Sequence, residues 1–210
     1  ISLAHNGVLF LDELPEYKRQ VLEVMRQPLE DRSVTISRAK FTVDYPASIM
    51  LIAAMNPCPC GYYNHPEKSC SCGTPAVQKY LNRVSGPLLD RIDLHVEVVP
   101  VSYNELTGEA SPENSKTIRE RVIATRLVQE KRFAGNPGVH CNAQMSSKQI
   151  RKYCQVDEAG STILKRAMDQ LGLSARAYDR ILRVARPMAD IDRSEKVEAA
   201  DLAEAIQDRG

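Results

Sequence analysis

The sequence predicts an α/β unit followed by a small helical bundle, and three observations support this fold class. Short apolar runs in the first half end in polar or acidic residues, as buried parallel strands do. The sequence between these runs shows the periodicity of a helix. Beyond Pro100 the sequence becomes polar and turn-rich, and helical periodicity alone follows. We therefore expect an α/β unit over residues 1–100, a linker over 101–114 and a helical domain over 115–210.

The composition indicates a soluble globular protein. The 210 residues are 43% hydrophobic, and 28 Lys and Arg nearly balance 27 Asp and Glu. Contact with nucleic acid would therefore need a local basic patch. No run is long enough for a membrane span, and the start lacks the features of a signal peptide. We expect a cytoplasmic protein without a membrane partner, and the initial Ile1 predicts part of a longer polypeptide.

The expected elements of the α/β unit follow one another in a regular order. Residues 8–11 read as a strand buried on both faces, and residues from about 15 to 28 read as a helix. The alternating stretches SVTIS and KFTVDY, at 33–37 and 40–45, predict a hairpin with a basic tip. Further apolar strands are expected over 48–57 and 92–99.

The second half contains helical patterns with recognisable ends. Ser or Asp precedes several of them as an N-cap, and Gly172 is a stop signal. Pro187 predicts a kink over residues 183–186 of its helix. The helices are expected at about 115–133, 146–154, 158–171, 174–190 and 194–208.

Polar residues at the strand ends form a candidate site. Asp12 and Glu13 directly follow the first apolar run, where an unpartnered buried carboxylate would be costly, and Asn56 ends the next run. Such an Asp can hold the Mg²⁺ of a nucleotide, and the adjacent Glu can polarise a water for attack on the γ-phosphate. Asn56 could orient that water. The alternative is a chance acidic pair that caps the following helix.

Four segments carry a resemblance to a known family: GVLFLDELPEY, AAMNPCPCG, SGPLLDRIDLHVEV and LSARAYDRILRVAR. In this order they resemble the AAA+ ATPases of the Mg-chelatase-like ComM/YifB type, over essentially the whole chain. The wider clade includes the Mg-chelatase ATPase subunit and the MCM helicases. The resemblance implies an AAA+ P-loop NTPase core, from its Walker B strand onward, followed by a helical lid domain.

The resemblance also implies roles for five residues. Asp12 and Glu13 match the Walker B pair, and Asn56 matches sensor 1. Arg91 matches the arginine finger offered to the nucleotide of the neighbouring subunit, and Arg176 matches sensor 2. ATP and Mg²⁺ are then the cofactors, and a homo-oligomer, expected to be a hexameric ring, is the assembly.

Both arginines have simpler interpretations. Arg91 could form a salt bridge with Asp90 or Asp93, and Arg176 could belong to a solvated basic face of its helix. The sequence G-x-x-x-x-G-K-[ST] of a phosphate-binding loop does not occur in the chain. By the resemblance this loop lies upstream, so we expect the chain alone to bind ATP weakly or not at all.

Two C-x-C pairs form a candidate metal site. Cys58, Cys60, Cys70 and Cys72 could supply four thiolates to a tetrahedral zinc ion and fix a loop that has little apolar content. Idle reduced thiols and oxidised pairs are the alternatives. His65 is a reserve ligand, and Cys141 and Cys154 lack paired spacing.

The expected substrate follows from the basic hairpin tip. Arg38 and Lys40 match in place the hairpin that projects into the central pore of the helicase relatives, and they could contact DNA phosphates without reading sequence. A solvated turn is the alternative. The leading hypothesis is a ring motor on single-stranded or branched DNA, in recombination or natural transformation. The others are a chelatase-type or chaperone-like ATPase that remodels a protein partner, and a regulatory module that holds nucleotide.

Overall fold

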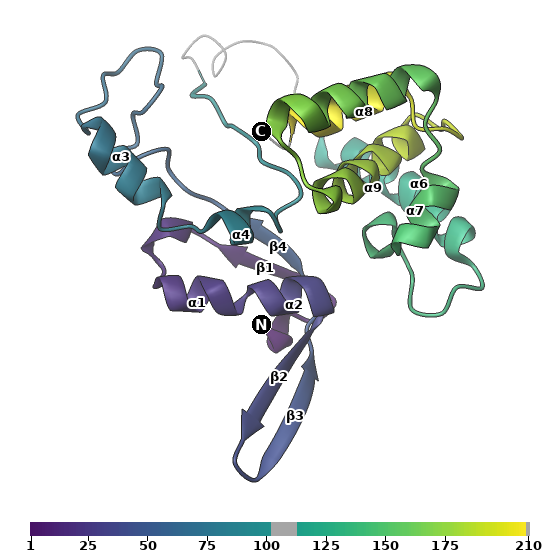
Figure 1. Ribbon diagram of the computed structural model, residues 1–210, viewed down its shortest axis with the longest axis horizontal. Helices are drawn as coiled ribbons and strands as arrows, with labels where there is room; N and C mark the ends of the chain where they lie inside the picture. The colour runs from purple at the N-terminus through teal and green to yellow at the C-terminus, as the bar shows by residue number, and fades with distance from the viewer. Residues whose placement is uncertain (102–112, 209–210) are drawn as a thin grey trace. The chain divides into compact units, whose positions relative to one another are not determined.

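The structure is a computed structural model that describes residues 1–101 and 113–208. It divides into two compact units, Ile1–Ile92 and Asp93–Gly210, and each is described by itself (Figure 1). A parallel strand pair together with many helices confirms the mixed α/β class. Most of the linker expected over 101–114 lies outside the described residues, and the predicted domain bounds stay a prediction.

Two parallel strands lie at the centre of the first unit. β1 covers Val8–Leu11 and β4 covers Met50–Ala53, with Leu11 opposite Ala53. One face of the pair packs against a core of buried side chains: Leu14, Leu22, Met25, Val84 and Leu88. Because the strands are parallel, the residues that follow them lie at the same edge of the sheet.

The expected burial of β1 on both faces is wrong. Val8 and Phe10 are 55% and 58% exposed, and Met50 and Ile52 on β4 are 61% and 45% exposed. Side chains alternate between the two faces of a strand, so these four share the face opposite the core. Packing from the described residues covers one face of the sheet and leaves this apolar face open.

The strand expected over 92–99 is also wrong. Residues 94–100 have no regular secondary structure, and Val96 and Val98 are 75% and 86% exposed. An alternating pattern forms a strand only beside a hydrogen-bonded neighbour, and the described sheets pair β1 with β4 and β2 with β3. The N–H of His95 donates instead to the carbonyl of Asp208, at 2.6 Å.

The helix expected after β1 is divided into two. A 3-10 turn at Leu14–Glu16 precedes α1 (Arg19–Val24) and α2 (Arg26–Asp31). Pro28 explains the division, because it has no N–H to donate to the carbonyl of residue 24 and its ring crowds that carbonyl.

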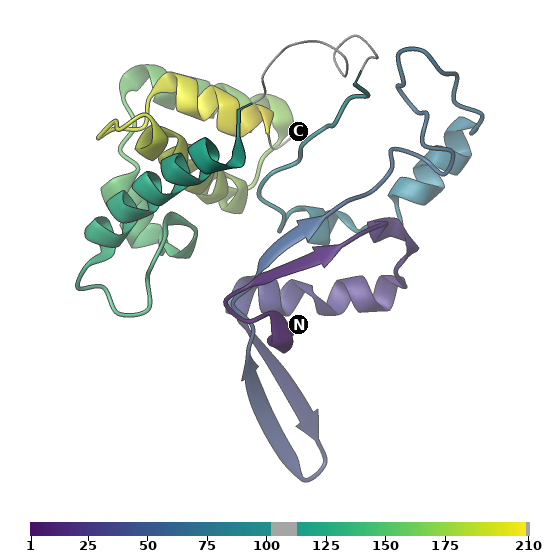
Figure 2. The same cartoon turned by 180° about the vertical axis from the view of Figure 1, so that it is seen from behind.

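The hairpin forms as expected. β2 (Ser33–Arg38) and β3 (Phe41–Pro46) pair in antiparallel fashion, with Arg38 opposite Phe41 across a turn at residues 39–40. Most side chains of both strands are exposed. The hairpin projects away from the β1–β4 pair and from α1 and α2, which Figures 1 and 2 show from opposite sides. Its tip is therefore open to solvent.

Two helices of the first unit escaped prediction. α3 covers Thr74–Leu81, and α4 covers Gly86–Leu89, where the Ser85 hydroxyl accepts the N–H of Leu88 at 3.3 Å. Each helix is short and has a proline in its first turn, so neither shows clear helical periodicity. α3 follows the four-cysteine segment directly and contributes the buried Tyr80.

Within the described residues, the second unit contains five α-helices, as expected. Asn114, Ser146, Asp157 and Ser174 each accept a backbone N–H at the start of a helix, and Gly172 ends one at φ 60°. The last helix begins later than expected. None of the helices in the described ranges has the length and apolar content needed to cross a bilayer. The helices are α6 (Ser115–Phe133), α7 (Ser147–Tyr153), α8 (Glu158–Leu171), α9 (Ala175–Ile191) and α10 (Ala199–Gln207).

α9 is the central helix of this unit and continues through Pro187. Its buried face includes Ile181, Leu182 and Ala185, which lie in the core with Ile150 of α7 and residues of α8 and α10. The proline therefore does not end the helix. The kink expected over residues 183–186 stays a prediction.

A buried ionic network joins α9 to α6. Arg132 of α6 forms an ion pair with Asp190, and the amide of Asn142 donates to the same carboxylate at 2.7 Å. Arg186 donates to Asp190 at 3.1 Å and to the carbonyl of Glu195 at 2.8 Å. Burial acts to raise the pKa of Asp190, but the hydrogen bonds from Arg132 and Asn142 hold it below its usual value. These charges are therefore structural.

Candidate functional site

The acidic pair and Asn56 follow the carboxyl ends of β1 and β4. The N–H of Ala54 donates to the carbonyl of Leu11 at 2.9 Å, and the N–H of Leu14 donates to the carbonyl of Ala54 at 3.0 Å. Asp12 and Glu13 lie between these two bonds, and Asn56 comes two residues after Ala54. The fold thus brings three of the predicted site residues to one edge of the sheet.

The local geometry of the acidic pair differs from the expectation of burial. Both Asp12 and Glu13 are exposed, so the expected burial of these carboxylates is wrong. The Oδ1 atom of Asp12 accepts the N–H of Glu13 at 2.9 Å, and Glu13 has a left-handed backbone with φ 50° and ψ 47°. This bend turns the chain out of β1 and leaves both carboxylates open to solvent.

Tyr80 and Arg83 border this edge and were missed by the sequence reasoning. Burial and the nearby Glu16 carboxylate raise the pKa of the Tyr80 phenol, which also hydrogen-bonds to the backbone of Asn56. Arg83 pairs with Glu16 at 2.8 Å and lies 6.0 Å from the centre of the Tyr80 ring. No motif marks either residue in the sequence, and Arg83 lies two residues beyond the end of α3.

Arg91 lies at the end of α4 with a largely buried side chain. Its guanidinium forms an ion pair with Glu30 of α2 at 2.8 Å and donates to the carbonyl of Pro87 at 2.5 Å. The side chain is 9% exposed. The arginine therefore ties α4 to α2 in this structure, and a role toward a neighbouring subunit would require the ion pair to open.

Arg176 belongs to the second unit, on the first turn of α9, and is exposed. The face it shares with other arginines is not uniformly solvated. Arg180 is 15% exposed and lies 3.8 Å from the carboxylate of Asp93, and Arg183 is partly buried. Of the three, Arg176 is thus the one open to solvent.

Arg38 ends β2 and Lys40 lies in the hairpin turn that follows, and both are exposed. The cross-strand contacts near them are neutral, since Ser37 and Thr42 share a hydrogen bond at 3.1 Å. Asp44 lies further from the tip and accepts the hydroxyl of Thr35 at 2.5 Å. The tip therefore presents two positive charges that face solvent.

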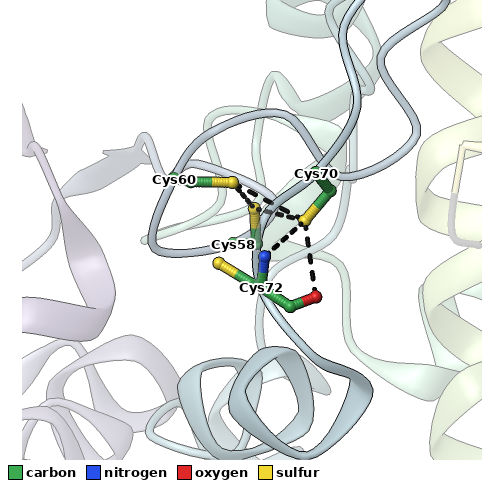
Figure 3. Close-up of side chains that lie close together, drawn as sticks. All are labelled: Cys58, Cys60, Cys70 and Cys72. Atoms are coloured by element: carbon green, nitrogen blue, oxygen red, sulfur yellow. Dashed lines mark hydrogen bonds between the residues drawn. The ribbon is translucent and has the colours of Figure 1, made fainter.

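The four cysteines of the C-x-C pairs come together as expected (Figure 3). Their sulfur atoms lie within 4.8 Å of one another, and the Cys58–Cys60, Cys58–Cys70 and Cys60–Cys70 distances are 3.4, 3.7 and 3.6 Å. All four are free of disulfides. His65 is outside the group, and its Nδ1 accepts the N–H of Glu67 at 3.1 Å.

The thiols of this cluster have divergent acidities. A hydrogen bond from the Tyr62 backbone lowers the pKa of Cys60 to about 5. The Cys72 amide acts to lower the pKa of Cys70, yet burial and hydrogen bonds with Cys60 and Cys58 raise it to about 12. Thiols this close compete for ionisation, because one thiolate disfavours a second beside it.

Two family models match almost all of the chain. The model of magnesium chelatase, subunit ChlI, matches residues 1–106, and the model of the C-terminal region of the same subunit matches residues 112–209.

Curated relatives agree with the family models. Competence protein ComM of Haemophilus influenzae is 44% identical over 98% of this chain, and the protein YifB of Escherichia coli is 43% identical over all of it. The chain spans 39% and 40% of their lengths. DNA replication licensing factor mcm6 of Dictyostelium discoideum is 26% identical over 73% of the chain and 15% of its own length.

Proposed function

We propose that this chain, which belongs to the magnesium chelatase ChlI family, is part of an ATP-hydrolysing ring motor of the AAA+ class that acts on DNA. The proposed ATP hydrolysis is supported by the arrangement of Asp12, Glu13 and Asn56 at one edge of the sheet. The chain spans about two fifths of the length of its relatives, so the activity is that of the whole protein.

Each residue of the edge has a separate task. Asp12 uses one oxygen to hold the Glu13 amide, and its other oxygen is available to hold Mg²⁺, a hard cation that prefers carboxylate ligands. When bound, Mg²⁺ neutralises charge on the nucleotide phosphates. Glu13 polarises the attacking water, and the Asn56 amide orients it. Tyr80 holds the Asn56 backbone in place.

The two arginines complete the proposed site. Arg91 contacts the γ-phosphate held by the next subunit once its ion pair with Glu30 opens, and Arg176 contacts the nucleotide from the helical unit. A guanidinium supplied in trans contributes about 10³ to 10⁵ in rate in related phosphoryl-transfer systems. A trans contribution requires that subunits adjoin in a ring or a filament, and we propose a hexameric ring.

The DNA part of the proposal is supported by the exposed charges of the hairpin tip. Arg38 and Lys40 project into solvent on a two-stranded arm and can neutralise phosphates of single-stranded or branched DNA. The similarity to a relative named as a DNA replication licensing factor favours the same class of substrate.

A second function, remodelling of a protein partner, is favoured by a different observation. Both family models describe a magnesium chelatase subunit. In that case ATP turnover would respond to a protein partner and would be insensitive to DNA.

DNA-stimulated ATP turnover of the whole protein distinguishes the two functions. In the double variant Arg38→Ala/Lys40→Ala, we expect stimulation to fall at least about tenfold and the salt dependence of DNA binding to weaken, because two phosphate contacts are lost. Lys165→Ala/Arg166→Ala on α8 is the matched control, since it removes the same charge from exposed positions elsewhere.

Retained stimulation and branched-DNA binding in the hairpin variant would overturn the DNA proposal. The absence of any DNA stimulation in the unmodified protein would favour the protein-remodelling function.

A further inference from the structure

The segment over residues 58–72 has no apolar core to hold it. Neither hydrophobic cluster of the described residues includes a member of this segment, and its two tyrosines, Tyr62 and Tyr63, are 38% and 41% exposed. Its contacts are short-range: the N–H of Gly61 donates to the carbonyl of Cys58 at 3.0 Å, and Lys68 lies over the Tyr62 ring at 5.0 Å. Segments of this kind commonly need a cross-link or a metal to fold.

The sulfur atoms have the spacing of a tetrahedral metal site. Zinc–sulfur bonds of about 2.3 Å place the corners of a tetrahedron about 3.8 Å apart. The three closest pairs, at 3.4 to 3.7 Å, lie near that edge length and well above the ~2.05 Å of a disulfide bond. Cys72 completes the group within 4.8 Å (Figure 3).

Backbone amides support the sulfur atoms. The N–H of Cys72 donates to the sulfur of Cys70 at 3.4 Å, and the backbones of Tyr62 and Ser71 hydrogen-bond to the sulfur of Cys60. Such outer-shell donors stabilise thiolate ligands and fix their orientation. Because all four ligands are soft sulfur atoms, the set favours Zn²⁺ over Mg²⁺ or Ca²⁺ and leaves no position for a reacting water.

The cluster connects the sheet edge to α3. Cys58 comes two residues after Asn56, and Cys72 comes two residues before the start of α3 at Thr74. α3 carries Tyr80, which hydrogen-bonds to the backbone of Asn56. A metal at the four sulfurs would thus close the loop that runs from Asn56 to α3.

We propose that Cys58, Cys60, Cys70 and Cys72 bind one Zn²⁺ in a closed four-sulfur site, which folds the 58–72 segment and holds Asn56 against α3. The site is structural. It goes beyond the proposed function and stands whether or not the protein hydrolyses ATP.

Metal content and cobalt substitution test the proposal on the whole protein, purified without chelators. We expect about one zinc per chain. After replacement by Co²⁺, we expect the intense visible and near-ultraviolet bands of tetrahedral cobalt–thiolate. Cys70→Ser and Cys72→Ser should each reduce bound zinc at least about tenfold, while Cys141→Ser, the matched control outside the cluster, should retain it.

A second measurement uses the unmodified protein, so it does not depend on whether the cysteine variants fold. Removal of zinc from the unmodified protein should make the cluster thiols reactive toward an alkylating agent and the 58–72 segment sensitive to protease, and added Zn²⁺ should reverse both. Absence of bound metal, an iron–sulfur absorption spectrum, or unchanged thiol reactivity after chelation would each overturn the proposal.

Discussion

Glu13 has a backbone conformation that residues other than glycine and asparagine rarely adopt. Its φ of 50° places it in the left-handed region, and the Asp12 carboxylate accepts its N–H at 2.9 Å. A non-glycine residue pays about 1 to 2 kcal/mol for this conformation, which tends to occur where function requires it. Arg32 and Arg193 have the same backbone region, so the conformation of Glu13 marks the turn of the chain out of β1.

A stability comparison tests this strain. Glu13→Gly and Glu13→Ala both remove the carboxylate, but only glycine adopts the left-handed region without steric cost. We expect the glycine variant to have the higher free energy of unfolding, by about 1 kcal/mol, in urea titrations at neutral pH. An alanine variant as stable as the glycine variant would show that the position is unstrained.

The sequence predicted which residues lie at the candidate site better than it predicted their exposure and contacts. Asp12, Glu13 and Asn56 could be placed at one edge because they follow apolar runs, and the structure places them there. Their exposure could not be predicted, because it depends on what covers the edge. Tyr80 could not be found either, since its contact with Asn56 depends on how the chain returns after the four-cysteine segment.

At the scale of elements, the packing of α9 depends on a carboxylate that is fully buried. Asp190 joins α9 to Arg132 of α6 and to Asn142, and its side chain has no exposed area. Its pKa is lowered in the folded state. A lowered acid pKa stabilises the fold at pH values above the unfolded-state value of about 3.8, and this contribution is lost as the pH falls through the folded-state pKa.

Substitution of Asp190 should remove this stabilisation. We expect Asp190→Asn to lower the free energy of unfolding at pH 7 by about 3 to 5 kcal/mol, because Arg132 and Arg186 lose their buried counter-charge. The loss relative to the unmodified protein should shrink below pH 4. Asp169→Asn, at an exposed position on α8, is the control and should change little. An equal loss at pH 7 and pH 3 would contradict the account.

Elements with their own end signals were predictable, and elements that depend on a neighbour were not. The three helices from α7 to α9 were expected nearly as found, because Ser146, Asp157, Ser174 and Gly172 mark their ends in sequence. The strand expected over 92–99 has the right alternation but no pairing partner in the described residues. The helix expected after β1 was drawn through Pro28, and in the structure it is divided into α1 and α2.

At the scale of the whole molecule, the proposed active site requires residues from more than one chain. Asp12, Glu13 and Asn56 meet within one unit, whereas Arg91 is proposed to act on the nucleotide of the next subunit. One chain would then contain an incomplete active site. Two variants that are each inactive should complement one another when their subunits mix in one ring.

ATP turnover by mixed rings of Glu13→Gln and Arg91→Ala subunits in the whole protein tests this claim most directly. Each variant alone should bind ATP but lose turnover by at least about 10³-fold. Random equal mixing should restore activity at about a quarter of the subunit junctions, where an intact Glu13 faces an intact Arg91. Normal turnover by Glu13→Gln alone, or mixed rings as inactive as their parents, would contradict the shared hydrolytic site.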